Sequence, residues 1–253
     1  MMLSVMNSNI IFAQESDDFL NELVGDNRLD TSNLASKYSV YDFSEIWTTT
    51  VDQCVVGIIG EEHMRIKVKI LEIEKRPNDT NLYLVSGKSS VMGNVCDFTG
   101  AIFIKKVHLF SVSGKNDVPR ENKPSKIRGV LVADYEFLEN TQQNHVGIFS
   151  GKLYSKWHLD SSNRVVYDDT DLTRKGYINN AYIGFWRSYE GNDKRICSWG
   201  DYRVPMSKDD FDIESELFRP ADKFRSKGWD IYIKAWHEDD AKAKSDELNP
   251  WWQ

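Results

Sequence analysis

The sequence lacks the long apolar run that a membrane-spanning helix needs. No stretch of its 253 residues approaches the roughly 20 consecutive apolar residues that cross a bilayer as a helix, so we expect no membrane span. Positive charge is also in deficit, because 32 Lys and Arg stand against 39 Asp and Glu, for a formal net charge of −7. An acidic chain lacks the electrostatic attraction to phosphates on which nucleic-acid binding depends, so we expect no nucleic-acid partner.

Motifs for the common cofactors and metals are also missing. The chain has no GxSxG, HExxH or EF-hand pattern, and its histidines are not spaced as metal ligands. Gly87-Lys88-Ser89 resembles part of a phosphate-binding loop, but Leu82 stands where that loop needs its first glycine. We therefore expect no cofactor and no metal, and assign no catalytic residues.

Cysteine is scarce, and Cys54, Cys96 and Cys197 form neither a CxxC pair nor a zinc pattern. All three lie in apolar, strand-like sequence, so we interpret them as small buried hydrophobic residues. One disulfide with a third free thiol is the alternative if the protein is exported.

Residues 1–40 are expected to form a leader, a short helix and a loop. Ile11-Phe12-Ala13 before Gln14 resembles the end of a signal peptide, although a basic start is missing and Asn7-Ser8-Asn9 interrupts the apolar stretch. This degraded signal peptide predicts a secreted or periplasmic protein, and a cytoplasmic protein is the alternative. The helix is expected because one helical face carries Phe19, Leu20, Leu23 and Val24.

Residues 41–236 are expected to form a single β domain, followed by an acidic helical or flexible tail over residues 237–253. Apolar and polar residues alternate from Arg65 to Ile70, and the phase changes at Leu71, which predicts a β-bulge. Turn sequences separate the expected strands without long helical patterns between them, which favours antiparallel pairing. The further strands expected are Leu82–Val85, Val95–Leu109, Ile127–Leu138, Val146–Leu159, Ala181–Tyr189, Lys194–Trp199 and Trp229–Trp236.

Three expected strands place an aromatic residue and a glycine two positions apart, on the same face. The pairs are Phe98 with Gly100, Phe149 with Gly151, and Tyr182 with Gly184. Glycine weakens a strand unless a bend or close packing requires it, so the pattern predicts a strongly coiled sheet. The expected fold is all-β and mostly antiparallel: a coiled meander that closes as a barrel similar to the calycin-like β-barrels, with a short N-terminal helix and a C-terminal tail. A β-sandwich is the alternative, and the similarity of architecture implies no function.

Two features near the carboxyl end depart from the strand pattern. Residues 200–228 lose the alternation, and we expect a long ordered excursion there. The chain ends with two adjacent tryptophans, Trp251 and Trp252, which we expect to dock on the surface of the domain itself.

The most distinctive candidate for binding is a hairpin in which aromatic residues alternate with arginines. It covers Gly184 to Tyr189 and Arg195 to Arg203. Such surfaces stack arginine on tryptophan and bind sugars, aromatic ligands or proteins, whereas in a purely structural hairpin the aromatics fill the core and the arginines pair with carboxylates. The predicted ligand-binding residues are Trp157, Trp186, Arg187, Tyr189, Arg195, Trp199 and Arg203.

These observations favour a non-enzymatic binding protein of the bacterial envelope or exterior. Its ligand, a small molecule, a glycan or a protein, is expected in the barrel mouth or on the aromatic and arginine hairpin. One alternative is a carbohydrate-acting hydrolase that uses paired carboxylates such as Asp134 and Glu136, although the alternation puts both on the polar strand face. Another alternative is an intracellular protein-interaction module without a small ligand.

Overall fold

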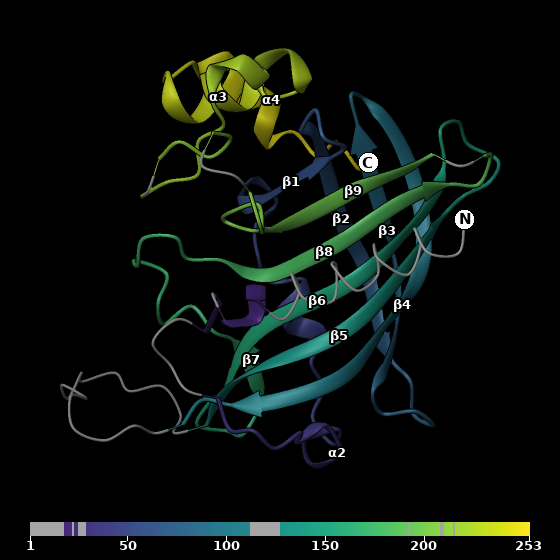
Figure 1. Ribbon diagram of the computed structural model, residues 1–253, viewed down its shortest axis with the longest axis vertical. Helices are drawn as coiled ribbons and strands as arrows, with labels where there is room; N and C mark the ends of the chain where they lie inside the picture. Colours follow the sequence, from purple (N-terminus) through teal and green to yellow (C-terminus); the bar gives the residue numbers. More distant parts are fainter. Residues whose placement is uncertain are drawn as a thin grey trace.

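The computed structural model describes residues 18–21, 23–24, 29–111, 127–191, 193–207, 210–214 and 216–253. The expected signal peptide, residues 1–13, lies outside these ranges. Over the described residues the chain forms a closed antiparallel barrel of eight strands with a ninth, short strand outside it (Figure 1). No helix in this part of the chain is long and apolar enough to cross a membrane.

The strands follow one another as an up-and-down meander. Strands β1 to β6 each pair with the next, β8 pairs with β6, and β9 pairs with both β8 and β1, which closes the barrel. Their bounds are β1 (Val55–Ile59), β2 (Met64–Lys75), β3 (Leu82–Val91), β4 (Asn94–Leu109), β5 (Arg128–Glu139), β6 (Gly147–Leu159), β7 (Val165–Tyr167), β8 (Asn179–Ser188) and β9 (Lys194–Asp201). The predicted all-β barrel is confirmed, its order fits the calycin-like arrangement, and the sandwich alternative is wrong because one sheet closes on itself.

Local sequence signals explain how the sheet bends. The register between β2 and β3 shifts between Ile70 and Glu72, so the bulge predicted at Leu71 is confirmed. Gly151 and Gly184 lie opposite each other on β6 and β8. A Cβ atom on Gly151 would overlap the carbonyl oxygen of Ile183, so the close approach of these two strands requires glycine.

Aromatic side chains fill the barrel interior. The rings of Tyr182 and Trp199 stack with centroids 4.6 Å apart, and Tyr135 contacts both. One end of the barrel is closed by the segment that contains α2 (Ala35–Tyr38) and η1 (Ser44–Trp47), followed by η2 (Asp52–Cys54). Buried aromatic and aliphatic side chains of this segment belong to the same core, namely Tyr38, Phe43, Ile46 and Trp47.

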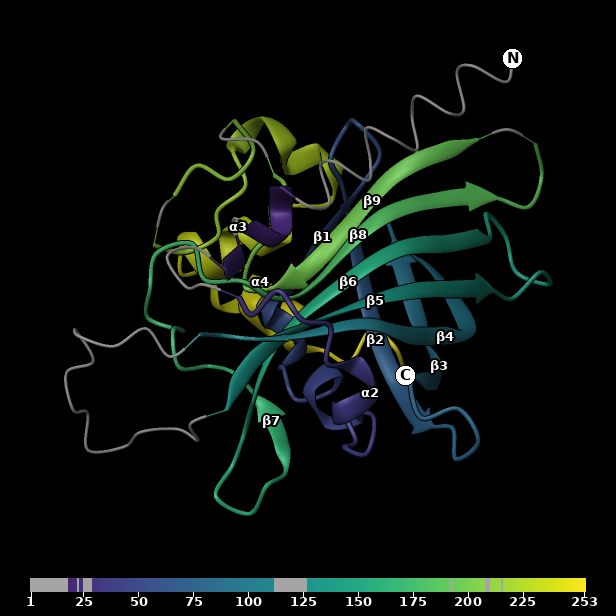
Figure 2. The ribbon, with the colours of Figure 1, turned by 60° about the horizontal axis from the view of Figure 1, so that its bottom comes forward.

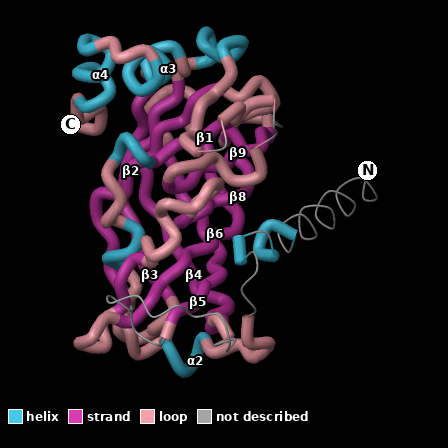
Figure 3. The backbone as a smooth tube through the Cα atoms, turned by 90° about the vertical axis from the view of Figure 1, so that its left-hand side faces the viewer, coloured by secondary structure: helices cyan, strands magenta, loops and turns pink. Residues whose placement is uncertain are grey.

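The strand predicted for Trp229–Trp236 is wrong, because this segment is helical. It contributes α3 (Asp230–His237), which follows η3 (Asp222–Lys227) and precedes α4 (Ala241–Leu248). The apolar residues recur every three or four positions, at Trp229, Tyr232, Ile233 and Trp236, which is the period of a helix. In Figure 3, α3 and α4 lie together at one end of the molecule and α2 lies at the other.

The long excursion and the helices pack on the outer wall of the barrel. Trp229 and Ile233 form a second core with Val56 and Ile58 of β1, to which the excursion contributes Val204, Phe211 and Phe218. The N-terminal residues 18–21 and 23–24 are helical, as predicted, and their buried Phe19 packs on the outer faces of β5, β6 and β8. At the carboxyl end, the ring of Trp252 lies against Lys69 of β2 at 5.0 Å, so this tryptophan docks on the domain itself.

Candidate functional site

A cavity of about 750 Å³ opens at the barrel end opposite to α2 and η1. It is lined by the ends of β1, β3, β5 and β8, the starts of β2, β4, β6 and β9, and loops that join these strands. Figure 2 shows the β5–β6 and β8–β9 hairpins ending on the same side of the barrel. This end is the mouth of the barrel, and it is the candidate functional site.

Glu139 at the end of β5 is the most unusual residue of the mouth. Strand alternation points it inward, in phase with Tyr135 and Phe137, which are core residues. The residue is only 5% exposed, yet it lines the cavity. A carboxylate therefore stands where the barrel interior meets the cavity.

Three neutral donors from three strands or strand ends point at this carboxylate. The Ser89 hydroxyl of β3 donates to Oε1, while the Gly147 amide and the Trp186 indole N–H each donate to Oε2 at 2.9 Å. The Tyr189 hydroxyl donates to the Glu139 carbonyl oxygen at 2.9 Å. The contacts fix the Glu139 side chain and the Trp186 ring in defined positions.

The electrostatics of Glu139 are those of an uncompensated buried acid. Burial raises the pKa of its carboxyl above the ordinary value, and the three hydrogen bonds oppose that rise. Among the described residues, no Lys, Arg or His nitrogen lies within 4.0 Å of the carboxylate. A buried charge without a counter-charge is costly, so its position at the cavity calls for a functional explanation.

The loop between β5 and β6 is held in place by contacts to β4. The Asp97 amide donates to Gln143 Oε1 at 2.8 Å, and the Gln143 amide group donates back to the Asp97 carboxylate at 3.1 Å. Asn94 Nδ2 donates to the carbonyl oxygen of Asn144 at 3.1 Å. The mouth is therefore preformed on this side.

Three of the seven predicted ligand-binding residues lie together at the mouth. Trp186, Tyr189 and Arg195 line the cavity, and Trp186 lies directly opposite Arg195 in the β8–β9 pairing. Arg195 makes three hydrogen bonds to the Asp193 carboxylate at 2.9 to 3.3 Å. Its charge is thus already partnered.

The other four predicted residues lie elsewhere. Trp157 and Trp199 are fully buried core residues, and Trp157 packs under Tyr38 and Phe43 at the closed end. Arg187 alternates with Trp186 and is therefore exposed on the outer wall. Arg203 pairs with Asp212 in the excursion. The buried Trp199 and the Arg203–Asp212 pair fit the purely structural alternative for the hairpin.

The closed end holds a second buried carboxylate, Asp201 of β9. Its Oδ2 accepts hydrogen bonds from Thr50 Oγ1 at 2.8 Å, Tyr167 OH at 2.9 Å and Asn180 Nδ2 at 2.8 Å. Burial raises the pKa of this carboxyl to about 7. The adjoining cavity is about 30 Å³, the size of one water molecule, so it admits no organic ligand.

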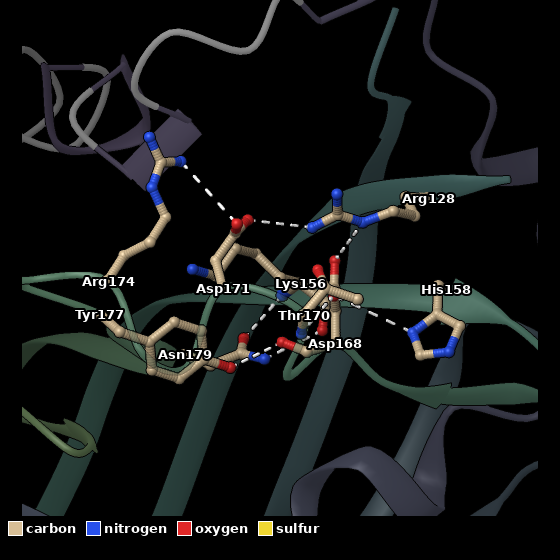
Figure 4. A network of polar contacts seen from close by, with 9 residues as sticks. All are labelled: Arg128, Lys156, His158, Asp168, Thr170, Asp171, Arg174, Tyr177 and Asn179. Carbon is tan, nitrogen blue, oxygen red and sulfur yellow. Dashed lines mark hydrogen bonds and ion pairs between the residues drawn. The ribbon is translucent and has the colours of Figure 1, made fainter. Parts of the chain in front are cut away.

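The acidic segment from Asp168 to Asp171 belongs to a polar network outside the barrel (Figure 4). The sequence favours a solvated loop at Asp168-Asp169-Thr170-Asp171, but the Asp168 side chain is buried and accepts from Arg128 Nε at 2.9 Å. Arg128 also bonds Asp171 at 3.1 Å. Neighbouring Lys156 lies 4.3 Å from the centroid of the Tyr177 ring, and burial lowers its pKa to about 8. This network ties β5, β6 and the following loop together.

The carboxylates considered for a hydrolase lie away from the mouth. Asp134 pairs with Lys152 and Lys105 on the outer wall, and Glu136 is exposed on the same face. Cys54, Cys96 and Cys197 are all free thiols, and the latter two are buried. The described residues contain no group of three or more His, Cys, Asp or Glu that could hold a metal ion.

Comparison with family models, with curated proteins and with solved structures finds no match to this chain.

Glu139 is the site residue that sequence reasoning missed. The expected strand ends at Leu138, because the following Glu139-Asn140-Thr141 is polar and typical of a turn. The missed signal was the strand period, since Leu131, Ala133, Tyr135 and Phe137 place Glu139 next on the inward face.

Proposed function

We propose that this protein is a non-enzymatic binding protein whose small-molecule ligand occupies the mouth of the barrel. The observation that carries the proposal is the preformed cavity of about 750 Å³, a volume typical of small-molecule sites. Its walls are mixed: Val91, Phe149 and Trp186 offer apolar surface, while Glu139 and Ser89 are buried polar residues of the lining. Polar groups that are fixed in position beside apolar surface are typical of a ligand pocket, because they orient the ligand.

The proposal is tested with N-phenyl-1-naphthylamine, an uncharged dye that fluoresces in apolar sites. We expect saturable binding of one dye per chain, and Val91→Trp should weaken it about tenfold or more, because the larger ring fills the cavity. Leu84→Trp is the matched control, since Leu84 is an exposed residue of the same strand. Equal dye affinity in the Val91 variant and the wild type, or no dye binding at all, would contradict the proposal.

The proposal also places the protein in the bacterial envelope or exterior, as a secreted or periplasmic protein. Its support is the sequence before Gln14, which resembles the end of a signal peptide. Amino-terminal sequencing of the protein from its host tests this placement. A mature chain that begins at Gln14 supports export, whereas an intact Met1 in the cytosol contradicts it.

A further inference from the structure

The Glu139 carboxylate has a free position for one more hydrogen bond. A carboxylate offers about four lone-pair positions, and three donors occupy three of them, one at Oε1 and two at Oε2. About one position therefore stays open at Oε1, on a group that lines the cavity. All three donors are neutral, so they orient the carboxylate without cancelling its charge.

The charges around the cavity point to the sign of the ligand. The acids lining it are Glu139, Glu190 and Asp193, and its arginine is Arg195, so its described residues carry a formal charge of 1 − 3 = −2 with His145 neutral. Arg195 is already held by Asp193. An anionic group would meet repulsion here, whereas a cation would meet attraction.

The walls suit a cation that carries an apolar body. The indole of Trp186 is fixed by its hydrogen bond to Glu139, and Phe149 and Tyr189 line the cavity near it. Aromatic faces attract organic cations, and they also accept the apolar part of a ligand. Val91 and Val146 add aliphatic surface.

We propose that the ligand of the mouth is a small organic ammonium ion, an amine with an aromatic or aliphatic body, whose N–H donates to Glu139 Oε1. This inference rests on the proposed function. The bound ammonium would supply the counter-charge that the buried carboxylate lacks. It would also explain why a strand whose other inward residues are apolar carries an acid at this position.

A purely structural role for Glu139 is the competing explanation, because the side chain joins β3, β6 and β8. The Glu139→Gln variant separates the two roles. The amide oxygen of the glutamine still accepts hydrogen bonds from Gly147 and Trp186, and its amide nitrogen donates to the Ser89 hydroxyl. The three hydrogen bonds that join the strands are therefore preserved. Only the charge is lost.

The experiment measures the affinity of three matched probes by calorimetry at pH 7.5: 1-naphthylmethylammonium, 1-naphthalenemethanol and 1-naphthoate. We expect the wild type to bind the ammonium about tenfold or more tighter than the alcohol, and the carboxylate most weakly. Glu139→Gln should remove most of the ammonium preference and leave the affinity for the alcohol nearly unchanged. Glu136→Gln, the same charge change on the outer face of the same strand, should leave the ammonium preference intact.

Equal binding of alcohol and ammonium by the wild type, or an ammonium preference that survives Glu139→Gln, would overturn the inference and leave the binding function standing. Absence of binding by all three probes and by the uncharged dye would overturn the binding function itself. The wild-type comparison of the probes needs no variant, so the inference stays testable if Glu139→Gln does not fold.

Discussion

Two buried carboxylates, at opposite ends of the barrel, differ in what surrounds them. Glu139 adjoins a cavity of about 750 Å³, whereas Asp201 adjoins a space of about 30 Å³. Both accept three neutral hydrogen bonds, and burial raises the pKa of both carboxyls. At the scale of the residue, the two carboxylates differ in the size of the adjoining space, and only the space beside Glu139 is large enough for the ligand that we propose.

Asp201 should make stability depend on pH. Its folded pKa of about 7 lies above the ordinary 3.8, so the folded state retains a proton that the unfolded state has released. The resulting stabilisation is complete below about pH 4 and is lost as the pH rises through 7. Between pH 5 and pH 8 this group alone should lower the free energy of unfolding by roughly 2–3 kcal/mol.

Urea unfolding at both pH values checks this prediction. Asp201→Asn should lose less stability than the wild type on going from pH 5 to pH 8, because the amide does not titrate. Asp134→Asn, on the outer wall beside Lys152, should lose as much stability between pH 5 and pH 8 as the wild type. If the Asp201 variant loses as much stability between pH 5 and pH 8 as the wild type, Asp201 does not titrate as described.

At the scale of the element, α4 is fastened to the barrel by a buried ion pair. Arg65 of β2 donates two hydrogen bonds of 2.6 Å to the Glu247 carboxylate, and Lys67 lies 3.5 Å from it. The Arg65 guanidinium also lies 5.2 Å from the Trp229 ring and 5.0 Å from the Tyr232 ring. The outer helices and the barrel thus share one packed interface.

Glu247→Gln should therefore destabilise the protein by about 3–5 kcal/mol, because it leaves the buried Arg65 and its neighbour Lys67 without an anion. Guanidinium-induced unfolding measures the change. Asp246→Asn removes the same charge from an exposed position of the same helix and should change stability little. A similar effect of both substitutions would mean that the Arg65 ion pair does not anchor α4.

The close contact of β6 and β8 gives a second prediction at this scale. Gly151→Ala should destabilise the protein by about 1–3 kcal/mol or more, since the new methyl group overlaps Ile183 and Gly184 backbone atoms. Thermal unfolding of this variant beside Ser150→Ala, its partly exposed neighbour, checks it. Equal stability of the two variants would show that the close contact between β6 and β8 does not require glycine at position 151.

The spacing of apolar residues along the sequence decided which strands and helices were predicted correctly. Alternation over Arg65 to Ile70 predicted a strand, and the change of phase at Leu71 predicted its bulge, because both depend on neighbouring residues only. The helix from Asp230 to His237 was missed because its apolar residues also fit a short strand at Ile231 and Ile233. Glu139 was missed because Glu139-Asn140-Thr141 is also typical of a turn, although the inward strand period of Leu131, Ala133, Tyr135 and Phe137 continues to Glu139. Its three hydrogen-bond donors lie on strands that are distant in sequence, so no local pattern could show them.

At the scale of the whole molecule, the fold has no disulfide among its three cysteines and buries two of their thiols. Cys96 and Cys197 are each at most 2% exposed, and burial raises the pKa of both thiols. We expect the native protein to expose at most one reactive thiol, Cys54, to 5,5′-dithiobis(2-nitrobenzoate), and all three after denaturation without a reductant. Fewer than three thiols in the denatured protein would reveal a disulfide that the structure does not contain.

The proposed binding function depends on an open, preformed mouth at one end of a filled barrel. Nuclear magnetic resonance of the labelled protein during titration with 1-naphthylmethylammonium tests it most directly. The account predicts that the largest shifts occur at the Gly147 amide and the Trp186 indole N–H, which both donate to Glu139. Shifts confined to the outer wall, or no shifts at saturating probe, would contradict it.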